Sequence, residues 1–169
     1  MIALGIQHWG LHRRIALMTV LSVGTQPRRL IAGFMLATAG LSMWISNPAT
    51  TAMMLPIAIS VVALLRGSFK KAAGEEGDPA GNFASCLMLA VAHAASIGGT
   101  GSLVGTPPNM VFVGMGKTMY PGAPEISFFE WMQVGLPFVI LFIPITWYYL
   151  TWFHSIEGTF AGSDEIIGA

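Results

Sequence analysis

Three long stretches of the chain contain no Asp, Glu, Lys or Arg, and they dominate its hydrophobic pattern. They run from Leu30 to Leu65, from Pro79 to Gly116 and from Trp131 to Ile156. A helix that crosses the hydrocarbon core of a bilayer needs about 20 apolar residues. The third stretch fits one crossing, and tryptophans near its two ends match the aromatic belts of membrane interfaces. The pattern predicts a membrane-crossing helix over residues 131–156.

The first two stretches are each much longer than one crossing requires, and each is interrupted in its middle. The first interruption contains Ser46, Asn47 and Pro48, and the second is the glycine-rich and proline-rich segment 98–109. Non-helical backbone inside a bilayer is tolerated only where it is buried in protein or lines a cavity. Both interruptions are therefore candidate parts of a functional site.

Basic residues flank the first stretch on both sides, with Arg28 and Arg29 before it and Arg66, Lys70 and Lys71 after it. Because cytoplasmic loops collect Lys and Arg, both ends of this stretch are expected on the cytoplasmic side. We therefore predict a re-entrant helical hairpin over residues 30–66, with its tip at 46–51. The second stretch is expected to cross once, as a discontinuous transmembrane helix over 81–116 that is unwound at 98–109.

The remaining segments are expected to connect these elements. Residues 1–29 are predicted to hold the end of a preceding helix and a cytoplasmic interfacial helix. A cytoplasmic linker is expected at 67–80, an extracytoplasmic loop at 117–130 and a polar tail at 157–169. The predicted fold is thus an all-α, multi-pass protein of the cell membrane, in contact with the lipid bilayer.

Composition excludes several other classes of protein. The chain has 169 residues, of which 54% are hydrophobic and 9% charged, with a mean hydropathy of +0.67. Soluble domains carry about 25% charged residues. The eight basic and eight acidic side chains cancel, which argues against a basic nucleic-acid binder and an acidic disordered segment. One cysteine, Cys86, allows no internal disulfide and no cysteine metal cluster.

The two interruptions share a helix-start signal. Asn or Thr is favoured at the N-cap and Pro at the first helical position, and the pairs Asn47-Pro48 and Thr106-Pro107 fit this rule. Helix starts offer free N–H groups that suit an anion, whereas helix ends offer carbonyls that suit a cation. Paired broken helices point to the binding site of a secondary transporter.

The lack of charge in both stretches favours a cation that enters together with an anion. No Lys or Arg lies in either stretch, and an uncompensated charge in a low-dielectric site costs several kcal/mol. Na⁺ cotransport would offset that cost. Ser42 lies one helical turn before Ser46. Ser42, Ser46, Asn47 and the carbonyl of Gly105 would form an all-oxygen set for a hard cation.

Other interpretations of these residues remain open. Hydroxyls in membrane helices often bond only a backbone carbonyl or a neighbouring helix. The glycine-rich segment lacks the lysine of a phosphate-binding loop. His93 fits a packed, hydrogen-bonded side chain as well as a proton relay. A membrane-embedded hydrolase would use Ser46 or Ser102 as its nucleophile, yet no Asp, Glu or Lys lies close to either in sequence.

Three motifs resemble those of the divalent anion:sodium symporter family, which carries dicarboxylates, citrate or sulfate. They are residues 11–17 (LHRRIAL), 42–57 (SMWISNPATTAMMLPI) and 95–109 (ASIGGTGSLVGTPPN). The resemblance implies an elevator-type transporter built from two inverted halves. Each half would contribute one Ser-Asn-Thr hairpin tip and one unwound helix. This chain resembles the end of the N-terminal half, so the resemblance also implies a missing C-terminal half and a homodimer.

The resemblance also assigns residues. It implies sodium ligands at Ser42, Ser46, Asn47 and Gly105, and substrate contacts at Asn47, Pro48 and Thr106. The third residue of the family's hairpin tip is usually Thr, and here it is Pro48. The implied function is sodium-coupled symport of divalent anions, foremost C4-dicarboxylates, and not an enzymatic activity. The alternatives are an arsenite permease, a cation antiporter or a membrane-embedded hydrolase.

Overall fold

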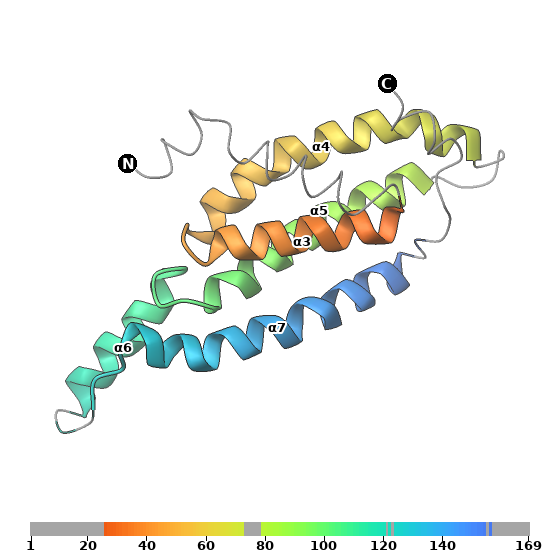
Figure 1. Ribbon diagram of the computed structural model, residues 1–169. Helices are drawn as coiled ribbons and strands as arrows, with labels where there is room; N and C mark the ends of the chain where they lie inside the picture. Colours follow the sequence, from red (N-terminus) through yellow and green to blue (C-terminus); the bar gives the residue numbers. More distant parts are fainter. Residues whose placement is uncertain (1–25, 73–78, 121, 123, 155, 157–169) are drawn as a thin grey trace.

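The computed structural model describes residues 26–72, 79–120, 122, 124–154 and 156 (Figure 1). Within these residues all regular structure is helical. The helices are α3 (Pro27–Ser42), α4 (Asn47–Ala72), α5 (Pro79–Thr100), α6 (Pro107–Met119) and α7 (Phe128–Phe153). The predicted polar tail and nearly all of the expected segment 1–29 lie outside the described residues. Within that segment the described part is residues 26–29, and α3 begins there at Pro27.

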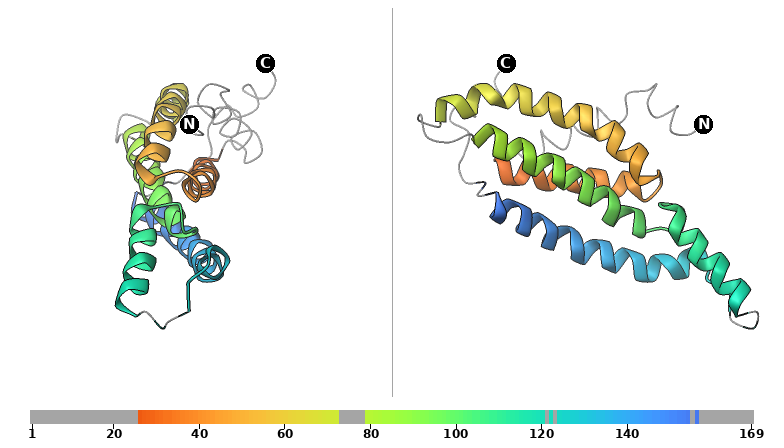
Figure 2. Two further views of the ribbon diagram at one scale, coloured as in Figure 1. Left: turned by 90° about the vertical axis from the view of Figure 1, so that its left-hand side faces the viewer. Right: turned by 180° about the vertical axis from the view of Figure 1, so that it is seen from behind.

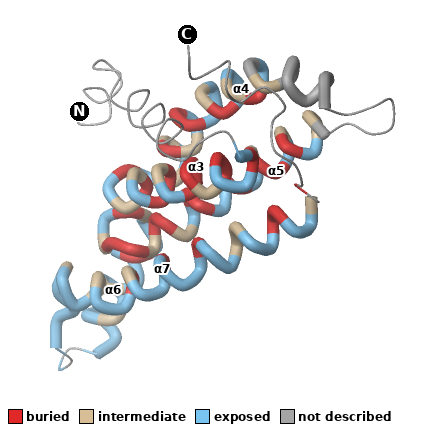
Figure 3. Tube along the Cα trace, turned by 45° about the vertical axis from the view of Figure 1, so that its right-hand side comes forward, coloured by how far each residue is buried: buried red, intermediate tan, exposed pale blue. Residues whose placement is uncertain are grey.

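The core lies between α3, α4 and α5, with α7 on the other side of α3 and α5 (Figures 1 and 2). Apolar residues recur at intervals of three and four along α3 and α5, which gives each helix one buried face. The largest fully buried apolar side chains are Ile31, Phe34, Met35, Met54, Phe83, Leu87 and Val91. Figure 3 shows the buried positions gathered where these helices face one another.

Most of α6 and α7 is exposed, as Figure 3 shows, and many of the exposed side chains are large and apolar. The described residues contain two helices long and apolar enough to cross a membrane, Ala80–Thr100 and Phe128–Phe153. The first is half buried among the other helices, whereas little of the second is covered. Such a surface suits lipid or further protein rather than water.

Helix α7 begins at Phe128, before the expected start at residue 131, because a capping box precedes it. The Ser127 hydroxyl accepts a hydrogen bond of 3.3 Å from the Glu130 amide. The Glu130 carboxylate accepts one of 2.7 Å from the Ser127 amide. These reciprocal bonds satisfy two N–H groups that a helix start otherwise leaves unpaired.

The turn between α3 and α4 is shorter than the expected tip at 46–51. Helix α3 ends at Ser42 and α4 begins at Asn47, so the turn spans residues 43–46. The N-cap is Ser46 rather than Asn47, because the Ser46 carbonyl accepts the first helical bond, 2.9 Å from the Thr50 amide. Helix α4 also continues past residue 66 to Ala72.

The unwound segment after α5 is also shorter than the expected 98–109. Helix α5 continues through Gly98 and Gly99 to Thr100, and α6 begins at Pro107, which leaves residues 101–106 non-helical. Thr106 is the N-cap of α6 and Pro107 its first residue, as the sequence predicted. Helix α6 then continues to Met119, into the segment expected to be a loop.

Candidate functional site

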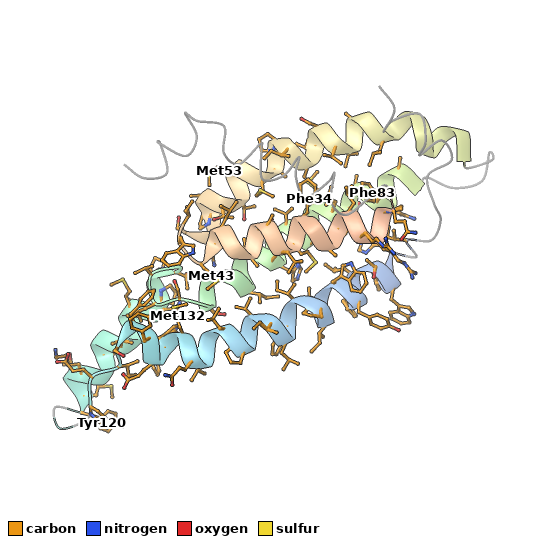
Figure 4. All side chains as sticks on the ribbon, in the orientation of Figure 1. Phe34, Met43, Met53, Phe83, Tyr120 and Met132 are labelled. Atoms are coloured by element: carbon orange, nitrogen blue, oxygen red, sulfur yellow. The ribbon has the colours of Figure 1, made fainter. Side chains whose placement is uncertain are left out.

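The turn 43–46 and the unwound segment 101–106 lie beside each other at one end of the helices (Figure 1). The Ser102 hydroxyl donates a hydrogen bond to the carbonyl of Met43, which is labelled in Figure 4. The same oxygen accepts a 3.1 Å bond from the Gly105 amide. Two interruptions that are far apart in sequence therefore form one structural unit.

The end of α5 is fully hydrogen-bonded. A helix leaves its last four carbonyls without partners inside the helix. Here the Ile97 carbonyl accepts from the Thr100 hydroxyl at 2.7 Å, and the Gly98 carbonyl accepts from the Gly101 amide at 2.9 Å. The Gly99 carbonyl accepts from the Asn109 side chain and the Thr100 carbonyl from the Trp131 indole, both at 2.9 Å. These four carbonyls are therefore occupied by the protein's own donors.

Asn109 closes the unwound segment from the far side. Its side-chain amide nitrogen donates to the Gly99 carbonyl at 2.9 Å and to the Ser102 carbonyl at 2.8 Å. The side chain is buried, so both donated bonds are shielded from solvent. Asn109 thereby ties the start of α6 to the end of α5.

Ser42, the last residue of α3, is fully buried and has an unusual set of neighbours. Its hydroxyl oxygen lies 2.7 Å from the Ala95 carbonyl and 2.8 Å from the Asn47 side-chain oxygen. A serine hydroxyl carries a single proton, so it can donate to only one of these two acceptors at a time. Ser42 therefore links the end of α3 to both α5 and the start of α4.

Gly105 lies directly against α3 and α5. A Cβ atom there would be 2.5 Å from the Gly99 carbonyl oxygen and 2.9 Å from the Ser42 carbonyl oxygen. Gly99 is equally confined, because a Cβ atom on it would overlap the Asn47 side-chain oxygen. Only glycine allows the backbones to approach this closely. The structure thus brings Ser42, Asn47 and Gly105 together.

Two backbone carbonyls at this place have no donor within the described part of the chain. These are the carbonyls of Ser42 and Gly105, both in buried residues. Most buried carbonyls in folded proteins are hydrogen-bonded, so such groups call for an explanation. They contrast with the fully satisfied end of α5.

The other predicted site residues are less buried than Ser42 and Gly105. Ser46 and Pro48 are exposed, and Thr106 is partly buried. The Thr106 side chain makes no capping bond at the start of α6. Because α4 starts beside Ser42 and α6 starts beside Gly105, the two helix starts flank the same place.

The segments that carry the predicted site residues contain no Asp, Glu, Lys or Arg, since none occurs in 30–65 or 79–116. A Lys117–Glu125 ion pair of 2.5 Å lies beyond them, at the far end of α6. The hydrogen bond and charge of Lys117 hold the pKa of the Glu125 carboxyl below its ordinary value. Within these segments, the groups that can complement a charge are helix ends, amides and hydroxyls.

The sequence does not predict the hydrogen bonds that Ser102, Asn109 and Trp131 make in this unit. Ser102 and Asn109 fall in the segment 98–109 that the sequence marks as part of a candidate site, but nothing in the sequence names their bonding partners, and Trp131 is predicted only as an interfacial anchor. Their partners are backbone carbonyls that no side-chain motif marks. The asparagine that follows the paired prolines is the one available signal, because an amide one turn into a helix can reach back to the preceding loop.

Comparison with known proteins supplies the family. The family model described as Citrate transporter matches residues 1–161. The sodium-dependent dicarboxylate transporter SdcS of Staphylococcus saprophyticus is 33% identical over 169 residues, which cover 98% of this chain and 32% of that protein. The Na(+)/citrate cotransporter of Rattus norvegicus is 35% identical over 184 residues, covering 90% of this chain and 32% of that protein.

A further relative is the SdcS protein of Staphylococcus aureus strain NCTC 8325, 37% identical over 149 residues, which cover 88% of this chain and 28% of that protein. The chain therefore spans about a third of the length of the curated relatives it matches. These relatives confirm the resemblance to sodium-dependent carriers of divalent anions. By the match over residues 1–161, this chain belongs to the citrate transporter family.

Proposed function

We propose that this chain forms part of a sodium-coupled symporter of divalent anions, with C4-dicarboxylates as the preferred substrates. Relatives named as sodium-dependent dicarboxylate and Na(+)/citrate transporters support this assignment. Within the molecule, one observation carries it. The buried carbonyls of Ser42, at the end of α3, and of Gly105, in the adjacent unwound segment, have no donor among the described residues.

A sodium ion would satisfy these carbonyls. Unwound backbone and helix C-terminal ends supply carbonyl oxygens to Na⁺ in secondary transporters. The Ser42 hydroxyl and the Asn47 side-chain oxygen add two further oxygens at the same place, 2.8 Å apart. Ser46 completes the proposed ligand set from the adjoining N-cap position.

The anion would bind at the starts of α4 and α6. Their free N–H groups and partial positive charge favour a carboxylate, and Asn47, Pro48 and Thr106 are the proposed contacts. The charge-free stretches provide no basic side chain to neutralise a dianion. Sodium bound beside these helix starts would supply the missing positive charge, which is the physical basis of the proposed coupling.

The proposed architecture follows the same reasoning. In it, α3 and α4 form the re-entrant hairpin and α5 and α6 the discontinuous transmembrane helix of one inverted half. The second half, an elevator movement and a homodimer belong to this proposal. Apolar side chains exposed along α6 and α7 support contact with lipid or with further helices.

A hydrolytic role receives no comparable support. The Ser102 hydroxyl is engaged with the Met43 carbonyl, and His93 is bonded through Nδ1 to the Leu89 carbonyl at 2.7 Å within its own helix. The described residues contain no group of three or more His, Cys, Asp or Glu side chains placed to hold a metal ion. The relatives named above are transporters.

Uptake by proteoliposomes containing the complete encoded protein tests the proposal. We expect uptake of labelled succinate that requires an inward Na⁺ gradient and stops when choline replaces Na⁺. Citrate and sulfate in parallel would define the substrate class. Succinate uptake that is independent of Na⁺, or transport restricted to arsenite or to cations, would overturn it.

A further inference from the structure

The Ser102 side chain occupies a position between the two interruptions that its role as a loop residue does not explain. It is fully buried. Its hydroxyl proton points to the Met43 carbonyl in the α3–α4 turn, and its oxygen receives the Gly105 amide. One hydroxyl therefore serves as donor to one interruption and acceptor from the other.

Both partners are adjacent to a carbonyl that has no donor in the described part of the chain. Met43 directly follows Ser42, so the Ser102 bond anchors the chain one residue from the Ser42 carbonyl. Gly105 donates its amide N–H to the Ser102 hydroxyl oxygen, and the same residue carries the second of these carbonyls. A change at Ser102 would therefore release the backbone next to both carbonyls without removing either one.

Other contacts at the site act differently. Asn109 and Trp131 bond to carbonyls of α5 and its loop, so they hold one interruption closed. The Ser42 hydroxyl bonds to Ala95 and Asn47 and is itself a proposed ligand. Among the described residues, Ser102 bonds to the backbone of both interruptions and is not itself a proposed sodium ligand.

We propose that Ser102 is a positioning residue for sodium, because it sets the spacing between the Ser42 and Gly105 carbonyls. This inference rests on the proposed function. Preorganised ligands bind an ion more tightly than ligands that must first be ordered. Loss of the hydroxyl would weaken sodium binding, whereas the helix starts proposed to bind the anion would remain in place.

The test compares sodium activation with anion affinity in proteoliposomes containing the complete encoded protein, with succinate as the probe. In Ser102→Ala, we expect the half-saturating Na⁺ concentration for uptake to rise about five- to tenfold, the size of one lost buried hydrogen bond. The KM for succinate, measured at saturating Na⁺, should stay within twofold of wild type. Ser102→Thr retains the hydroxyl and should restore the wild-type sodium response.

Ser96→Ala is the matched control. Ser96 lies on α5, is exposed and bonds only within its own helix, to the Ala92 carbonyl at 3.2 Å. Both constants should be unchanged in this variant. If Ser102→Ala does not fold, Ser102→Cys replaces it, because a thiol keeps the size but donates weakly, and a smaller rise is expected.

The outcomes separate the inference from the function on which it rests. A wild-type protein without Na⁺-dependent uptake would overturn the proposed function. Sodium-dependent wild-type uptake with an unchanged half-saturating Na⁺ concentration in the alanine or cysteine variant would overturn the role of Ser102 alone. An equal rise in both constants would also overturn it. A merely structural effect would reduce the amount of active protein and leave both constants unchanged.

Discussion

The indole N–H of Trp131 donates a 2.9 Å hydrogen bond to the carbonyl of Thr100, the last residue of α5. Four residues later on α7, a Cβ atom on Gly135 would lie 2.7 Å from the same carbonyl oxygen. Residues four apart share one face of a helix. One face of α7 therefore both caps the end of α5 and packs closely against it.

Replacing Trp131 with Phe should destabilise the protein. The aromatic bulk is retained, but the Thr100 carbonyl loses its donor, at a cost of about 1–3 kcal/mol. Denaturant unfolding of the purified protein in detergent would measure this loss. Trp152→Phe is the control, because Trp152 is 66% exposed on the same helix. Equal stability of the two variants would contradict the capping role of Trp131.

Replacing Gly98 with Ala should disturb the crossing of α3 and α5. A Cβ atom on Gly98 would overlap the Ala39 backbone, which cannot yield as a flexible side chain could. The expected loss of stability is about 1–3 kcal/mol, as for other overpacked positions. Gly114→Ala, on α6 with open space around its Cβ position, provides the control in the same thermal unfolding assay. A Gly98 variant as stable as wild type would show that the helices can separate without cost.

Replacing Asn109 with Ala should open the unwound segment. Two carbonyls, those of Gly99 and Ser102, would lose their donor at once. Hydrogen exchange should then accelerate at the amides of residues 101–106, because local opening costs less when these bonds are absent. Exchange in the core of α3 should not change. Asn82→Ala, at an exposed position on α5, is the control, and the same acceleration there would contradict a specific closing role.

Local signals in the sequence were sufficient to locate both helix interruptions. Thr106-Pro107 starts α6 as predicted, because N-cap and first-turn preferences act over a few residues. Asn47-Pro48 marked the start of α4 to within one residue. The Ser127–Glu130 capping box was also readable in the sequence, and it would have placed the start of α7 correctly.

The roles that depend on close approach could not be read from the sequence. Gly98 and Gly99 were interpreted as unwinding residues, yet both are helical and are needed because Ala39 and Asn47 lie against them. Likewise, the Trp131 indole bonds to Thr100, 31 positions away, and Ser102 bonds to Met43, 59 positions away. Such pairs depend on how the helices pack, which hydrophobic periodicity alone does not specify.

Replacing Asn47 with Ala should abolish Na⁺-dependent uptake. The change removes a proposed sodium ligand and the 2.8 Å partner of the Ser42 hydroxyl. It also removes a proposed contact to the anion, so neither excess Na⁺ nor excess succinate should restore transport. Asn82→Ala serves as the control in the same proteoliposome assay. Sodium-coupled uptake that survives in the Asn47 variant would count against the proposed site.

Replacing Pro48 with Thr should tighten the apparent affinity for dicarboxylate. Pro48 is exposed at the start of α4, where it offers neither an N–H nor a hydroxyl to a bound carboxylate. Threonine supplies both donors, and one added hydrogen bond to a charged group should lower the KM for succinate about tenfold. Pro56→Thr, within the same helix but away from its start, controls for the removal of a proline. The KM should be measured at saturating Na⁺, so that any change reflects the anion site. An unchanged or higher KM in the Pro48 variant would mean that the carboxylate does not contact this helix start.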